Sequence, residues 1–268
     1  MDALSGSARH RRVAFLWALA LIVLLAISGS VASANTAYAS TAVDSAPNAD
    51  GVRILCTTDT HSQDAPGKFR NADGTTSNLG GFARLATALQ DNRLTDKTLV
   101  FDSGDFSEGT IFATLLTTDA VELSQMSRLG YNAIALGNHD FDYGDQALVK
   151  ELSSYRSLGG TAPVLCSNLM NSADTSHTAT DNSANPLAAS GVSNYQIIQT
   201  NGHKVGVFSL MGKEAADYTS TEEYAFADII KTAQDYVKFL RDQEGCDLVV
   251  LLSHSGTVTG EDQKLAGR

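Results

Sequence analysis

From Val52 onward, short apolar runs alternate with longer segments in which apolar residues recur with helical spacing. This alternation is typical of strands joined by crossover helices, and it predicts an α/β fold with a largely parallel sheet. The chain has 268 residues, enough for one large domain or two small ones with a sizeable core. The predicted strands cover residues 52–56, 98–101, 133–136, 164–166, 205–210 and 248–252.

Two segments between these strands carry helical stripes. Their apolar members are Phe82, Leu85 and Leu89 in the first and Leu123, Met126 and Leu129 in the second. Asp119, with Glu122 three residues later, predicts the N-cap of the second helix, and Gly130 suits its C-terminal exit. A last helix is expected over about residues 222–241, leading into the final strand.

One pair of strands is expected to be antiparallel. Asn201-Gly202 lies between the segments 195–200 and 204–210. An Asn-Gly pair suits the two-residue turn of a β-hairpin, so part of the sheet should be mixed.

Residues 1–34 have the features of an export signal. Three arginines precede an apolar run over residues 13–27, and Ala32-Ser33-Ala34 fits a signal-peptidase site. Fifteen apolar residues are short for a membrane span of about 20, so we expect removal, with a retained anchor or a buried helix as alternatives. The small polar residues 35–49 predict a linker that leads into a domain over residues 50–268.

The charge of the mature chain limits its partners. Without residues 1–34 the chain loses three of its 19 basic and one of its 30 acidic residues, which leaves a formal charge of −13. An acidic surface repels phosphate backbones, so we expect no nucleic-acid partner. A small anionic substrate remains compatible with this charge if cations in the site reverse the local field.

The three cysteines are an odd number for an exported chain. Cys56, Cys166 and Cys246 lie in or beside apolar strand-like runs. We therefore interpret them as small buried hydrophobic residues, in preference to a disulfide or a nucleophile.

Polar residues cluster where predicted strands end. Three of the six histidines follow an apolar strand within a few residues, namely His61, His139 and His254. The others belong to the signal, to a polar loop over residues 171–185 and to the hairpin, and are His10, His177 and His203. Carboxylates and an amide share the strand ends: Asp59, Asp102, Asp105, Asn138, Asp140 and Asp142. Side chains at the carboxyl ends of strands in open α/β sheets converge on one edge, where sites are assembled.

Carboxylates gathered at one place need positive charge nearby to balance them. Like charges brought together cost Coulomb and desolvation energy, and divalent cations remove that cost. Imidazole, carboxylate and amide oxygen together suit zinc, manganese or iron. Each motif alone, GNHD included, is compatible with a polar turn. Four such motifs at the ends of four predicted strands favour a metal site.

The segments "TTDTH", "FDSGDFSEGT", "ALGNHDFDYG" and "LLSHSG" resemble, in this order, the motifs of the calcineurin-like metallophosphoesterases. The form GNHDFD, with "GGFARLATAL" upstream, is similar to the 5′-nucleotidase branch, which includes UDP-sugar hydrolases and cyclic-nucleotide phosphodiesterases. The resemblance implies a layered sandwich of mixed, largely parallel sheets flanked by helices. It also implies an exported, metal-dependent hydrolase of nucleotide phosphate esters, with UDP-sugar or 2′,3′-cyclic nucleotide hydrolysis as alternatives.

The resemblance further implies a centre of two divalent metal ions. Asp59 and His61 would hold the first ion, Asp105 would bridge both, and Asn138 and His254 would hold the second. Two such ions would neutralise phosphoryl oxygens and activate a water.

The same resemblance assigns a catalytic pair. His139, held by Asp142, would face the substrate phosphate and assist the leaving oxygen. Asp140 and Asp102 would have structural roles.

One family feature is missing from the sequence. The family has a further G-H-x-H motif after another strand, and its nucleotidase branch has a C-terminal domain that holds the base; neither occurs before Arg268. We therefore expect the catalytic domain to be incomplete at its C-terminal end. A surface binding or adhesion protein that uses this fold without catalysis is the alternative of a different class. A serine hydrolase is disfavoured because no G-x-S-x-G occurs.

Overall fold

The computed structural model describes residues 51–93, 97–174, 181–256 and 260–266. The expected signal, the expected linker and His177 lie outside these residues. Within them, no helix combines the length and the apolar character needed to cross a membrane.

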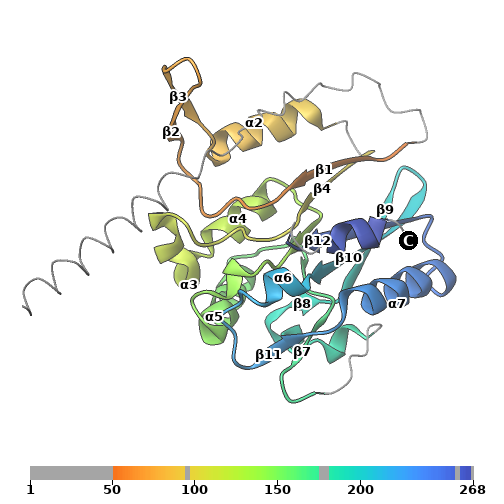
Figure 1. Ribbon diagram of the computed structural model, residues 1–268. Helices are drawn as coiled ribbons and strands as arrows, with labels where there is room; N and C mark the ends of the chain where they lie inside the picture. The colour runs from red at the N-terminus through yellow and green to blue at the C-terminus, as the bar shows by residue number, and fades with distance from the viewer. Residues whose placement is uncertain (1–50, 94–96, 175–180, 257–259, 267–268) are drawn as a thin grey trace, which may run out of the picture. The chain divides into compact units, whose positions relative to one another are not determined.

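The described residues form an alternating series of strands and helices (Figure 1). The strands are β1 (Arg53–Thr57), β2 (Gly67–Arg70), β3 (Thr76–Leu79), β4 (Thr98–Asp102), β5 (Ala133–Ala135), β6 (Val164–Leu165), β7 (Leu169–Asn171), β8 (Val192–Ser193), β9 (Tyr195–Thr200), β10 (His203–Met211), β11 (Tyr224–Phe226) and β12 (Leu248–His254). The α-helices are α2 (Phe82–Asn92), α3 (Leu116–Asp119), α4 (Val121–Arg128), α5 (Asp145–Ser157), α6 (Lys213–Ala216), α7 (Ile229–Asp242) and α8 (Glu261–Ala266). Short 3₁₀ helices cover Ile111–Leu115, His139–Phe141, Asn182–Ala184 and Ala188–Ser190.

The main sheet is parallel throughout. Its five strands follow the order β1-β4-β5-β6-β8, and each pairs in parallel with the next. All six predicted strands are confirmed, four of them in this sheet. The crossover connections between them carry the helices α2, α4 and α5.

A second sheet is mixed. It has the order β12-β10-β9, with β10 parallel to β12 and antiparallel to β9. The predicted hairpin is confirmed: Asn201 and Gly202 turn the chain between β9 and β10 with φ of 47° and 79°. Positive φ at both positions is what a type I′ turn requires.

The two sheets pack face to face and helices cover their outer faces. Leu99 and Phe101 of β4 share one apolar cluster with Val205 and Val207 of β10. On the other face of the main sheet, α2, α4 and α5 bury residues such as Leu123 against it. Helix α7 covers the outer face of the second sheet with Tyr236, Phe239 and Leu240, among others. The layered α/β sandwich implied by the resemblance is therefore the observed fold, with a small β2–β3 hairpin projecting beside α2 (Figure 1).

Two predicted helix starts are wrong. Helix α7 begins at Ile229, where the side chain of Asp228 accepts from the Lys231 backbone N–H, and the preceding residues form β11. Asp119 ends α3, and α4 begins after Ala120, which has φ of 41° and makes no side-chain cap. The short strand β11 lies inside the predicted last helix, whereas the short helix α3 precedes α4 and is separated from it by Ala120. The exit at Gly130, with φ of 73°, agrees with prediction.

The cysteine interpretation holds for Cys166 and Cys246, which are buried, and is wrong for Cys56, which is exposed. Cys56 lies on the edge strand β1 and its register partner Phe101 is fully buried. The second sheet covers Phe101 but, within the described part of the chain, does not extend over β1.

The polar loop over residues 171–185 is only partly a surface loop. Asn185 is buried, and its side-chain amide donates to the Cys166 carbonyl and to Asn194 Oδ1, both at 2.8 Å. A buried amide needs such partners, which its sequence neighbours do not reveal.

Candidate metal and phosphate site

Four strand ends meet at one place, but they come from both sheets. Strands β1, β4 and β5 belong to the main sheet and β12 to the second. The loops after β1 and β4 are joined by backbone hydrogen bonds, with the His61 N–H donating to the Asp105 carbonyl at 3.0 Å. The loop after β4 is joined to β12, because His254 Nδ1 donates to the Ser103 carbonyl at 2.9 Å. The site therefore lies where the two sheets converge.

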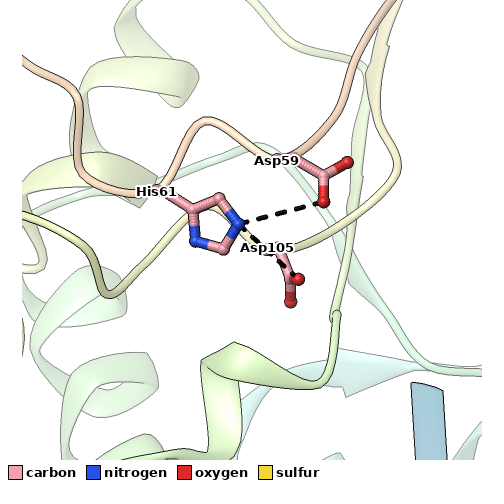
Figure 2. Close-up of side chains that lie close together, drawn as sticks. All are labelled: Asp59, His61 and Asp105. Atoms are coloured by element: carbon pink, nitrogen blue, oxygen red, sulfur yellow. Dashed lines mark ion pairs between the residues drawn. The ribbon is translucent and has the colours of Figure 1, made fainter. Parts of the chain in front are cut away.

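Asp59, His61 and Asp105 form the first group of potential metal ligands (Figure 2). His61 Nε2 lies 3.9 Å from Asp59 Oδ1 and 3.9 Å from Asp105 Oδ2. These distances exceed those of hydrogen bonds, and Figure 2 shows both carboxylates directed at the same ring nitrogen. His61 Nδ1 is buried without a hydrogen-bond partner among the described residues. Oxygen and nitrogen atoms that converge without bonding one another suit a shared cation.

Asp105 also belongs to a second group, with Asn138 and His254. His254 Nε2 lies 3.1 Å from Asp105 Oδ2 and 3.1 Å from Asn138 Oδ1. Its other ring nitrogen donates to a backbone carbonyl, the arrangement that commonly orients a metal-binding imidazole. The structure thus brings all five predicted ligands together around Asp105.

Asp105 and His254 shift each other's pKa in opposite directions. Burial would lower the pKa of His254, but the hydrogen bond and charge of Asp105 raise it to about 9. Burial opposes ionisation of Asp105, yet His254 and the His139 backbone N–H hold its pKa below the usual value. Asp105 is therefore an anion, and it has to be balanced by positive charge.

His139 and Asp142 form the predicted pair beside this group. His139 Nδ1 lies 2.6 Å from Asp142 Oδ2, and the His139 backbone N–H donates to Asp105 Oδ1 at 2.8 Å. The hydrogen bond to Asp142 is the main cause that raises the pKa of His139. Since Nδ1 faces Asp142, Nε2 is the ring nitrogen that remains for another partner.

Buried carboxylates support the loops that carry the predicted ligands. Asp140 accepts from the backbone N–H groups of Gly137, Asp105 and Ser107 and from the Ser107 hydroxyl, at 2.8–3.1 Å. Asp102 accepts from Thr57 Oγ1 and the Gly104 N–H. Burial raises the pKa of Asp140 to about 6 and that of Asp102 to about 7. Through these hydrogen bonds both side chains help to position the loop that follows β4.

Backbone strain is concentrated at this site. Among the described residues, seven non-glycine residues have positive φ, and five of them lie in the two ligand loops: Asp59, His61, Ser62, Asp105 and Glu108. Left-handed conformations cost energy outside glycine and are typical of functional sites that the surrounding structure over-determines.

The site opens into a cleft of about 620 Å³. Its lining includes Asp59, Asp105, Asn138, His139, Asp142 and His254. In the described part of the chain no lysine or arginine lines the cleft, and Glu214 adds another carboxylate. The carboxylate and amide oxygens and imidazole nitrogens present fit a metal centre, and bound cations would offset the negative charge of the cleft.

The sequence did not single out three residues beside this site. One potential ligand atom from each of Glu108, His139 and Asp142 lies within 4.8 Å of the other two. Ser220 Oγ donates to Asp142 Oδ1 at 3.3 Å, and Tyr218 lines the cleft. Glu108 follows Asp105 by three residues and could have been noticed there, whereas the other two are brought in by tertiary packing.

The calcineurin-like phosphoesterase family matches residues 52–267, so the chain belongs to this family. A 5′-nucleotidase from Diplobatis ommata is 31% identical over 221 residues, covering 80% of this chain and 35% of that protein. The structure of Haemophilus influenzae NAD nucleotidase has a TM-score of 0.64 at 28% identity and covers 80% of this chain and 36% of its own. The 5′-nucleotidase precursor from Thermus thermophilus also has a TM-score of 0.64, at 30% identity, with 80% and 39% coverage. The chain spans about a third of the length of the curated relatives it matches.

Proposed function

We propose that the intact protein is an exported, metal-dependent phosphoesterase that hydrolyses nucleotide phosphate esters in the manner of a 5′-nucleotidase. The observation that carries the proposal is the position of Asp105 between two histidines, 3.9 Å from His61 Nε2 and 3.1 Å from His254 Nε2. One carboxylate shared by two ligand groups is what a dinuclear centre requires. The names of the relatives support nucleotides as the substrate class.

Asp59, His61 and Asp105 would hold one divalent ion, and Asp105, Asn138 and His254 the other. The ions would neutralise the phosphoryl oxygens and lower the pKa of the attacking water, and zinc, manganese and iron all suit this donor set.

His139 acts on the leaving group in this proposal. Its Nδ1 is held by Asp142, and the hydrogen bond to Asp142 raises the pKa of the ring, which favours its protonated form. Nε2 then donates its proton to the alkoxide oxygen as the phosphorus–oxygen bond breaks, and a later proton from water restores the imidazolium.

Regions outside the described residues complete the proposal. Residues 1–34 would direct export and be removed, and a further C-terminal region would contribute to binding. The second point is supported by the greater length of the relatives, of which this chain matches about a third. N-terminal sequencing of protein recovered outside the cell should begin at Asn35, and an intact Met1 there would contradict removal.

The decisive experiment measures AMP hydrolysis and metal content of the intact protein. We expect two divalent ions per chain and loss of activity with chelator, restored by zinc or manganese. Asp105→Asn should lose both metal and activity, whereas Asp235→Asn, an exposed carboxylate on α7, should lose neither. Undiminished hydrolysis in the presence of chelator would refute the metal mechanism, and metal binding without hydrolysis of any nucleotide would favour the binding-protein alternative.

A further inference from the structure

The segment from Gly212 to Ser220 forms one wall of the cleft and is attached to the site at both ends. The Gly212 N–H donates to the backbone carbonyl of His254 at 2.8 Å. At the other end, Ser220 Oγ contacts Asp142 at 3.3 Å. These two hydrogen bonds place the segment beside His254 at one end and Asp142 at the other.

Tyr218 lies within this segment and lines the cleft. Its N–H donates to the Ala215 carbonyl at 2.9 Å, which continues the turn that ends α6. The residue nevertheless remains 71% exposed. The backbone is therefore anchored while the ring stays available to a ligand.

The ring differs chemically from the rest of the cleft. Apart from Tyr218 and the two histidines of the site, the described lining residues are small, hydroxyl-bearing, amide or acidic side chains. Glu214 lies on the same wall and its carboxyl group packs over Gly256. An acidic wall disfavours a second phosphate there, whereas an exposed aromatic ring presents a face on which an uncharged planar group can stack.

We propose that Tyr218 is a substrate-binding residue that stacks on the nucleobase of a nucleotide whose phosphate lies at Asp105 and His139. This inference rests on the proposed function and adds a contact to the leaving group. A base has two faces, so a stacking contact from Tyr218 is compatible with a second contact from a further region of the intact protein. Every nucleobase has a flat face on which an aromatic ring can stack. Tyr218 should therefore favour nucleotides over simple sugar phosphates without selecting one base.

The test compares two phosphate esters that share a sugar, AMP and ribose 5-phosphate, with the intact metal-loaded protein. Removal of a stacking ring typically weakens binding by about 5- to 100-fold. We expect Tyr218→Ala to raise KM for AMP by about 10-fold while KM for ribose 5-phosphate and metal content stay unchanged. Tyr218→Phe should behave like the wild type, because it keeps the ring.

Phe69→Ala is the matched control, since Phe69 is also an exposed aromatic residue but lies on the β2–β3 hairpin and does not line the cleft. Equal loss with both esters in Tyr218→Ala would overturn the inference in favour of a structural or sugar contact. No loss with either ester would overturn it outright. Both results would leave the proposed function intact, whereas a wild-type protein that hydrolyses neither ester would refute the proposed function itself.

Discussion

Two neighbouring side chains, Asn138 and His139, divide the proposed chemistry between holding metal and moving a proton. Asn138 and His139 are adjacent in sequence, yet Asn138 Oδ1 contacts His254 while the His139 ring turns to Asp142. The separation arises because a 3₁₀ turn begins at His139. Adjacent residues can therefore serve two functions at one strand end.

The separation predicts a specific phenotype for His139→Ala. The variant should keep most of its metal, because no proposed ligand is removed, and should lose turnover by about 10²- to 10⁴-fold, the usual contribution of a general acid. Metal analysis and kcat for AMP on the same samples test this. A variant emptied of metal would show that His139 is a ligand.

A larger side chain at position 137 would collide with Asp105. A Cβ added at Gly137 would lie 2.3 Å from Asp105 Oδ1 and 2.4 Å from the Asp105 backbone nitrogen, so the shared ligand would have to move. We expect Gly137→Ala to lose metal affinity and activity by at least about 10-fold, as other displacements of a positioned group do. Isothermal titration with zinc or manganese measures the affinity.

Gly159→Ala is the control for Gly137. Gly159 has φ of 84° and nothing within 4 Å of an added Cβ, so its substitution strains the backbone without reaching the site. It should lower stability and leave metal affinity unchanged. If both variants lost affinity equally, general destabilisation would explain the result.

Residue types at strand ends were enough to predict that Asp59, His61, Asp105, Asn138 and His254 lie close together, whereas the contact between His139 and Asp142 was implied by the resemblance to the family. The sequence motifs did not mark Tyr218. Its segment reaches the cleft because β10 ends at Met211, opposite His254, and because Gly212 and Ser220 make hydrogen bonds there. Short-range motifs mark groups that a strand delivers directly. They do not mark groups delivered by tertiary packing.

At the scale of elements, β11 explains why α7 is shorter than its sequence pattern suggests. Phe226 lies opposite Leu169 of β7 in an antiparallel pair, and its ring packs against Phe141 with centroids 5.8 Å apart. This pairing with a distant strand overrides the local helical preference of residues 222–228. Periodicity alone cannot show such a partner.

The position of the helix start predicts which carboxylate stabilises α7. Asp228→Ala removes the side chain that accepts from the Lys231 N–H at 2.7 Å, and should lower the free energy of unfolding by about 1 kcal/mol. Glu222→Ala removes an exposed side chain at the start that the sequence suggested, and should change it by less than about 0.5 kcal/mol. Urea denaturation of both variants decides between the two starts.

At the scale of the whole domain, the site depends on the packing of two sheets. Sequence order suggested that four strands end at one sheet edge, but β12 belongs to the second sheet, and His254 reaches the others through Ser103 and Asp105. The shared core that holds the sheets together includes Phe101 and Val207. Disturbing that core should therefore separate His254 from the predicted ligands of the main sheet.

The domain also buries a carboxyl group that no described partner neutralises. Glu151 on α5 is fully buried and both of its oxygens lack hydrogen-bond partners among the described residues. Burial, followed by the charges of Asp140 and Glu122, raises its pKa well above the usual value. In the native protein the group is therefore neutral over a range of pH in which the unfolded chain ionises it.

This shift fixes the sign of a pH effect on stability. Below the ordinary glutamate pKa both states are protonated and Glu151 costs nothing by titration. As the pH rises above that value, the unfolded state releases its proton first, so the free energy of unfolding falls by up to about 1.4 kcal/mol per pH unit until the native group also ionises.

Glu151→Gln removes this penalty while keeping the shape of the side chain. Urea denaturation should show that the variant gains stability over the wild type at pH 8 and gains little at pH 4, whereas exposed Glu223→Gln follows the wild type at both. Parallel profiles for Glu151→Gln and the wild type would mean that the native structure ionises Glu151 as readily as the unfolded chain does.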